Sequence, residues 1–140
     1  MRDHVESPVL LGPDGESAQW VEEIARTAHC PWAVFGKERQ GDRDVRLAPL
    51  PLDRFAGRVP VLADDIISSG TTMLEAAALL RTAGFDAPVC IAVHALFDRT
   101  TSAKLEGVGR ALITSDTIPN PYSLFRVAPL IADELAAVPA

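Results

Sequence analysis

Apolar and polar positions along the chain follow two different periods, one typical of strands and one typical of helices. Short apolar runs bounded by turn residues predict buried strands at residues 9–11, 32–35, 61–67, 88–97 and 111–113. Between them the apolar spacing lengthens to three and four residues, which predicts helices that begin near Ser17, Thr71, Thr101 and Pro129. Strands that alternate with helices indicate right-handed crossovers. We therefore expect a three-layer α/β/α sandwich with a mainly parallel sheet.

Two predicted helices have a continuous apolar face. In the first, that face holds Val21, Ile24, Ala25 and Ala28. In the second it holds Met73, Ala76, Ala77 and Leu80, and Gly84 is a natural C-terminal stop. Residues 36–58 are polar by contrast and contain the one basic stretch of the chain. We expect them to form a strand end followed by a mobile excursion.

Composition limits the classes of protein to which the chain can belong. Its 140 residues, 48% of them apolar and 23% charged, predict a single globular domain over residues 1–140. A net charge of −6 argues against a nucleic-acid partner, because phosphate binding needs a clustered positive field. No apolar run approaches the ~20 residues that span a bilayer. Cys30 and Cys90 have neither zinc nor disulfide-framework spacing, which predicts a cytoplasmic protein.

Candidate chemistry concentrates where the strand at residues 61–67 runs into the next helix. Two adjacent carboxylates, Asp64 and Asp65, lie near the end of this buried strand. Small residues follow directly: Ser68, Ser69, Gly70, Thr71 and Thr72. Hydroxyls and backbone N–H groups at a helix N-terminus suit a phosphate, whereas carboxylates accept hydrogen bonds from sugar hydroxyls or coordinate Mg²⁺. This combination predicts a site for a phosphorylated sugar; a capped turn with solvated acids is the alternative.

This segment resembles the ribose-phosphate-binding signature of the type I phosphoribosyltransferase fold. Four further segments resemble ribose-phosphate diphosphokinases, the synthetases of phosphoribosyl pyrophosphate (PRPP), in the same order: residues 12–17, 36–45, 92–97 and 114–119. The resemblance extends from about Ser7 to Leu135. It matches the C-terminal half of such an enzyme, which is built from two related domains.

The resemblance implies a role for each candidate residue. Asp64, Asp65 and residues 68–72 would hold ribose 5-phosphate. Lys37 and Arg39 would lie on a flexible catalytic loop and stabilise charge while pyrophosphate moves from ATP to the sugar. Asp14 would bind the Mg²⁺ cofactor, and a second domain would supply most ATP contacts. The expected partners are thus ribose 5-phosphate, ATP or PRPP, and a homo-oligomer or a preceding N-terminal domain, with no membrane.

Other interpretations of the same residues stay open. A free-standing phosphoribosyltransferase would use the loop to bind PRPP, and a non-catalytic regulatory homologue would only bind a sugar phosphate or nucleotide. Lys37 and Arg39 also fit a solvated pair, and Asp14 fits an ordinary turn. His94 fits a structural histidine, and Asp116 a helix cap.

Overall fold

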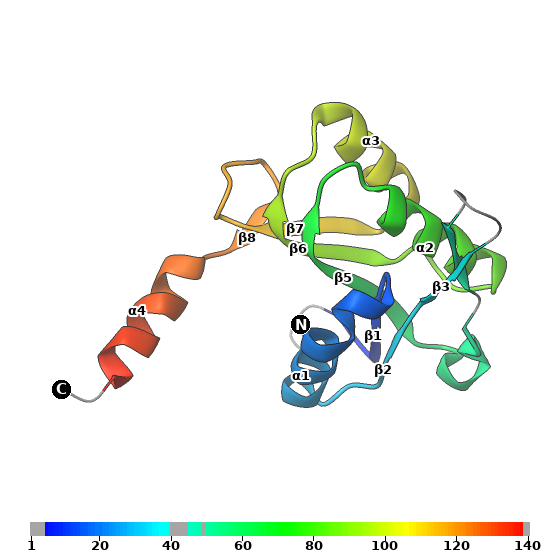
Figure 1. Ribbon diagram of the computed structural model, residues 1–140, viewed down its shortest axis with the longest axis horizontal. Coiled ribbons are helices and arrows are strands. Elements are labelled where there is room, and N and C mark those ends of the chain that lie inside the picture. The colour runs from blue at the N-terminus through cyan, green and yellow to red at the C-terminus, as the bar shows by residue number, and fades with distance from the viewer. Residues whose placement is uncertain (1–4, 40–44, 49, 139–140) are drawn as a thin grey trace.

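A six-stranded sheet forms the centre of the molecule, and every adjacent strand pair in it is parallel (Figure 1). The computed structural model describes residues 5–39, 45–48 and 50–138. The strand order is β2-β1-β5-β6-β7-β8. The strands are β1 (Pro8–Gly12), β2 (Trp32–Val34), β5 (Val59–Ile67), β6 (Val89–Ala95), β7 (Ala111–Ser115) and β8 (Ser123–Phe125).

Helices lie on both faces of this sheet, which confirms the three-layer prediction. Helices α2 (Thr71–Thr82) and α3 (Arg99–Val108) cover one face. On the other face, α1 (Ala18–Ala28) packs at the β1–β2 end and follows the short 3-10 helix η1 (Gly15–Ser17). Helix α2 buries the face predicted for it, which consists of Met73, Ala76, Ala77 and Leu80. Gly84 has the left-handed conformation expected of a helix stop, with φ +83°.

The predicted apolar face of α1 is only partly correct. Val21 and Ala25 are fully buried, but the Ile24 side chain is 44% exposed. The reason is that α1 covers one edge of the sheet, so a narrow stripe of the helix meets the strands and positions beside that stripe face solvent.

Residues 36–58 contain more regular structure than the predicted excursion. Strands β3 (Gly36–Arg39) and β4 (Val45–Ala48) pair antiparallel, and the 3-10 helix η2 (Leu52–Phe55) follows. Leu47, Leu52 and Phe55 are buried in the same core cluster as Met73. The prediction was wrong because charged neighbours outnumber these apolar side chains and hide their spacing. Residues 40–44 lie outside the described residues.

The chain ends in an unexpected strand and an expected helix. Strand β8 was not predicted, since its three residues follow a proline-rich turn and carry no alternation long enough to detect. Helix α4 (Val127–Ala137) matches the predicted C-terminal helix and projects away from the sheet (Figure 1). Among the described helices, none has the length and apolar composition that crossing a bilayer requires.

Candidate active site

The sheet topology places a switch point at the carboxyl ends of β1 and β5. From β1 the chain crosses over to β2 on one side, whereas from β5 it continues to β6 on the other side. Neighbouring strands whose connections leave in opposite directions form a switch point, where parallel α/β sheets bind ligands. Asp14 follows β1, and Asp64 and Asp65 lie near the end of β5. The fold thus brings together acids that are 50 residues apart in the sequence.

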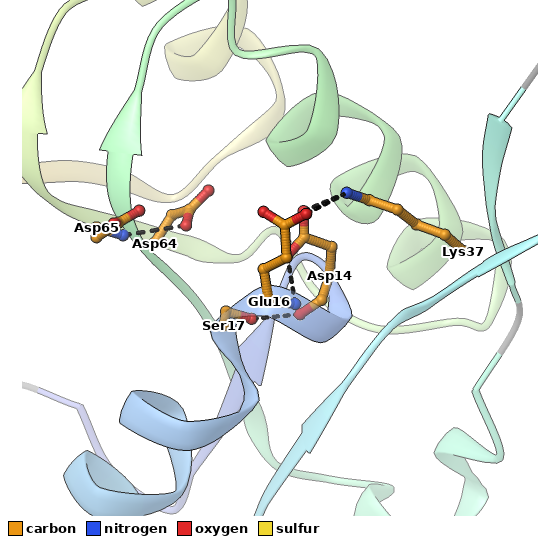
Figure 2. Close-up of polar contacts among 6 residues, drawn as sticks. All are labelled: Asp14, Glu16, Ser17, Lys37, Asp64 and Asp65. Atoms are coloured by element: carbon orange, nitrogen blue, oxygen red, sulfur yellow. Dashed lines mark hydrogen bonds and ion pairs between the residues drawn. The ribbon is translucent and has the colours of Figure 1, made fainter.

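Asp14 is held in place by its own turn and carries a cationic partner. Its Oδ1 accepts a hydrogen bond from the Glu16 N–H (3.0 Å), which caps η1. Its Oδ2 lies 2.9 Å from the Lys37 Nζ, which reaches across from β3 (Figure 2). The Asp14 side chain is 16% exposed and that of Lys37 is 41% exposed. The hydrogen bond to Asp14 raises the pKa of Lys37, so the ammonium form is reinforced at this position.

The chain entering the turn that carries Asp14 has no room for a side chain at Gly12. Ser17 is buried, and its Oγ donates a hydrogen bond to the Asp14 backbone oxygen (2.5 Å). A Cβ on Gly12 would approach the Ser17 Oγ to 2.1 Å and Val34 Cγ1 to 2.5 Å. Glu16 adds a second carboxylate, with its Oε1 3.8 Å from the Lys37 Nζ. Our sequence reasoning assigned no role to Ser17 or Glu16, although Asp14 and Ser17 have the spacing of a helix cap.

Asp64 and Asp65 are adjacent but have different environments. Asp64 is half-buried, and its Oδ1 accepts a hydrogen bond from the Asp65 N–H (3.0 Å). Asp65 is exposed, and its Oδ1 accepts one from the Ile66 N–H (2.8 Å). Burial raises the pKa of Asp64 to about 7, and the nearby charges of Asp65 and Asp14 act in the same direction. Near neutral pH Asp64 can therefore either donate or accept a hydrogen bond, whereas an ionised carboxylate only accepts.

The loop after β5 ends in a glycine that fixes its path. Gly70 is buried with φ +71°, and its carbonyl accepts the Leu74 N–H (2.9 Å) to begin α2. A Cβ at Gly70 would lie 2.8 Å from Thr101 Cγ2 on α3. The loop is therefore pressed against α3 at this point, and the left-handed backbone favours glycine.

The polar groups of this loop face outward. Ser68, Ser69 and Thr71 are exposed, Thr72 is half-buried, and the Ser69 and Thr71 hydroxyls lie 3.0 Å apart. Gly70 offers α2 no side-chain cap, and the first turn of α2 contains no acidic residue. N–H groups at such a helix start attract anions. The loop therefore has the properties of a phosphate cradle, next to carboxylates that would repel a phosphate.

Other residues singled out from the sequence have separate partners. His94 Nδ1 lies 2.9 Å from the Thr117 hydroxyl, and that hydroxyl donates to the Val93 carbonyl (3.1 Å). Asp116 accepts a hydrogen bond from the Val127 N–H (2.9 Å), which agrees with the helix-capping interpretation. Arg39 lies in β3, but its side chain is outside the described part of the structure.

The donor set at Asp14 fits a cation with few protein ligands. Among the described residues, no three His, Cys, Asp or Glu side chains gather closely enough to hold a metal by themselves. Mg²⁺ commonly binds one or two carboxylates and takes its other oxygens from water and substrate phosphates. Asp14 already binds the Lys37 ammonium, which shows that its position favours positive charge. A magnesium site completed by substrate is compatible with this arrangement.

Comparisons with known proteins agree with the fold. A ribose-phosphate pyrophosphokinase of Methanopyrus kandleri is 35% identical over 129 residues, which cover 91% of this chain and 44% of that protein. Ribose-phosphate pyrophosphokinase 2 of Archaeoglobus fulgidus is 34% identical and covers 91% and 47%. The crystal structure of phosphoribosylpyrophosphate synthetase from Mycobacterium smegmatis matches with a TM-score of 0.72 and 26% identity, over 94% of this chain and 45% of that one.

The chain spans about half the length of these relatives. The family model for the phosphoribosyl transferase domain matches residues 1–122, which is most of the chain. The chain belongs to the phosphoribosyl transferase domain family, and within it is similar to the ribose-phosphate pyrophosphokinases.

Proposed function

We propose that this chain carries the ribose 5-phosphate site of a PRPP-forming enzyme. The observation that supports this most directly is the arrangement at the end of β5, where an acidic pair is followed by an outward-facing loop that leads into a helix start with no side-chain cap from Gly70. The loop from Ser68 to Thr72 would bind the 5-phosphate. Asp64 and Asp65 would bind the ring hydroxyls, for which carboxylates are suitable acceptors.

The reaction would transfer pyrophosphate from ATP to the sugar. The oxygen of the C1 hydroxyl forms a bond to the β-phosphorus of ATP and releases its proton to solvent. The bond from that phosphorus to the α,β-bridging oxygen breaks, and AMP leaves with the electron pair. Such a transfer needs cations placed where negative charge develops. Lys37 supplies one such charge from β3, and we assign Arg39 the same role on the same strand.

Asp14 would hold Mg²⁺ together with oxygens of the substrate. When bound, the metal supplies positive charge that neutralises the transferring phosphates. Asp14 is suited to this because Glu16 N–H and the turn behind it fix the carboxylate before any ligand arrives.

The second half of the active site would come from elsewhere. The relatives are about twice as long as this chain, and the resemblance to them implies a related half that contacts most of the ATP. We therefore propose that the chain binds ribose 5-phosphate alone and transfers pyrophosphate only with that half, on the same polypeptide or a partner.

The direct test is calorimetric titration of the chain with ribose 5-phosphate, with and without Mg²⁺. We expect saturable binding that an Asp64→Asn, Asp65→Asn double variant loses. Asp86→Asn is a matched control, because this exposed acid lies on the loop between α2 and β6, outside the β5 segment. Equal binding by the double variant and the control would contradict the assignment of the sugar site.

A further inference from the structure

A histidine with one engaged ring nitrogen lies at the carboxyl end of β6. His94 is half-buried, and its strand partner is Ile66, two residues after Asp64 on β5. The His94 Nδ1 lies 2.9 Å from the hydroxyl of Thr117, which is on the loop that follows β7. Among the described residues, the His94 side chain has no other hydrogen-bond partner. Its second ring nitrogen, Nε2, is therefore available to a ligand.

The contacts around Thr117 decide which ring nitrogen of His94 carries the hydrogen. Three oxygens lie in mutual contact there: the Val93 carbonyl oxygen, the Ser115 Oγ and the Thr117 Oγ1. The Ser115 Oγ is 2.6 Å from the Val93 oxygen, and the Thr117 Oγ1 is 3.1 Å from it. The two hydroxyl oxygens are 2.9 Å apart. A carbonyl has no hydrogen to donate, so two hydroxyl hydrogens serve all three contacts.

This shortage of hydrogens fixes the form of the imidazole ring. If Thr117 donated to His94, a single hydrogen would remain for three oxygen–oxygen contacts. More hydrogen bonds form when both hydroxyl hydrogens stay among the oxygens and the His94 Nδ1–H donates to the Thr117 Oγ1. A neutral imidazole carries a hydrogen on one nitrogen and a lone pair on the other. His94 is thus held with Nε2 as a hydrogen-bond acceptor.

The same contact sets the direction in which Nε2 faces. Strand β6 lies between β5 and β7 (Figure 1). Thr117 follows β7 and bonds to the Val93 carbonyl, which also accepts from Ser115 at the end of β7, so Nδ1 faces the β7 side. The two nitrogens of an imidazole point in widely different directions, so Nε2 faces away from β7. On that side β5 ends, with its acidic pair and the loop to Thr72.

An acceptor at this place fits a ligand group that offers a hydrogen. A phosphate monoester near neutral pH is mostly a dianion, whose oxygens only accept hydrogen bonds. Mg²⁺ takes oxygen ligands, and among the described residues no three His, Cys, Asp or Glu side chains gather to hold another metal. A sugar hydroxyl can donate, and sugar hydroxyls are the groups proposed to lie at Asp64 and Asp65. A hydroxyl is therefore the suitable partner for Nε2.

We propose that Nε2 of His94 accepts a hydrogen bond from a hydroxyl of the bound sugar phosphate, and that Thr117 is the positioning residue that holds His94 in the Nδ1–H form. This contact rests on the proposed function, because ribose 5-phosphate is the ligand that brings the hydroxyl. It adds β6 to the elements that bind the sugar, beside β5 and the loop that follows it.

Two substitutions separate this role from a purely structural one. The side-chain amide of Asn replaces Nδ1, so His94→Asn keeps a partner for Thr117 and loses the distal acceptor. The longer side chain of Gln places its amide near the position of Nε2. In calorimetric titration with ribose 5-phosphate, we expect His94→Asn to bind about 3- to 10-fold more weakly than wild type, as for one lost hydrogen bond, and His94→Gln to recover most of the affinity.

His29→Asn is the matched control, because His29 is exposed at the end of α1 and should have no part in binding. Analogues of ribose 5-phosphate that each lack one hydroxyl identify the group that His94 contacts. For one analogue, the loss of affinity should be larger in wild type than in His94→Asn. Weaker binding by His94→Gln than by His94→Asn, or equal sensitivity of wild type and His94→Asn to every analogue, would overturn the proposal.

NMR spectra that correlate ring protons with ring nitrogens test the form of His94 without a ligand. We expect the Nδ1–H form in wild type and a loss of that preference in Thr117→Val, which keeps the shape of the side chain but removes its hydroxyl. An Nε2–H ring in wild type would overturn the proposal. If wild type does not bind ribose 5-phosphate, the proposed function fails and the His94 contact fails with it. If wild type and His94→Asn bind it equally, the His94 contact alone is refuted.

Discussion

Asp64 should make the fold less stable as the pH rises. Burial at the end of β5 raises the pKa of this carboxyl from 3.8 to about 7. Below about pH 4 both the folded and the unfolded chain hold the proton, so the titration of Asp64 does not change the free energy of unfolding. Between about pH 4 and 7 the unfolded chain releases the proton while the folded chain keeps it, and the free energy of unfolding falls. Above about pH 7 the loss is complete.

The size of this effect follows from the displaced pKa. A shift of about three units at about 1.4 kcal/mol per unit sets a ceiling of about 4 kcal/mol. Asp64→Asn keeps the shape of the side chain and an oxygen for the Asp65 N–H, but removes the charge. Near pH 4, we expect the unfolding free energies of wild type and variant to differ only by a constant offset that does not depend on pH. By pH 8 the variant should have gained about 2–4 kcal/mol over wild type.

Urea unfolding at half-unit steps from pH 4 to 8.5 measures this difference, with the fluorescence of Trp20 and Trp32 as the signal. Asp65→Asn is the control, because it removes the charge of an exposed neighbour and should give a much smaller change with pH. Plots of unfolding free energy against pH that run parallel for wild type and Asp64→Asn would refute the reasoning, because the difference between them would then not come from titration of Asp64.

Three further substitutions, one of them with a matched control, probe the packing around the switch point between β1 and β5. Gly70→Ala should lower the free energy of unfolding by about 1–3 kcal/mol, because its left-handed backbone and its approach to α3 leave no place for a Cβ; chemical denaturation measures this. Gly12→Ala should lower it by a similar amount, whereas Gly15→Ala, where a Cβ meets open space, should not, and equal losses would contradict the packing. Lys37→Gln should change it by less than about 1 kcal/mol, since its pair with Asp14 is partly exposed; a loss above about 2 kcal/mol in the same assay would show that the pair is structural.

Local periodicity was sufficient to predict most of the sheet and its helices. The apolar face of α2 was correct residue by residue, because a helix that covers a sheet broadly buries every position of its stripe. Ile24 was wrong because the extent of coverage over α1 depends on the width of the sheet beneath it, which no local pattern encodes. Strand β8 and the β3–β4 hairpin were missed because they lack the contiguous apolar run from which the other short strands were predicted.

The candidate site was likewise predictable from the sequence only in part. The acidic pair and the loop to Thr72 were recognisable because they are contiguous, and their roles remain predictions. The contact between Lys37 and Asp14 was not predictable from spacing, because it joins a turn and a hairpin that meet only in the folded chain. The raised pKa of Asp64 likewise has tertiary causes, namely burial and the approach of Asp14.

The ion pair between Lys37 and Asp14 has a consequence for how another cation would bind at Asp14. A partly exposed pair of this kind is worth at most about 1 kcal/mol, so the pair is open in at least roughly one molecule in six at any moment. Lys37 is thus a replaceable counter-ion of Asp14. If Asp14 holds Mg²⁺ as proposed, the arriving cation would replace the Lys37 ammonium, which would then be free to contact an anion.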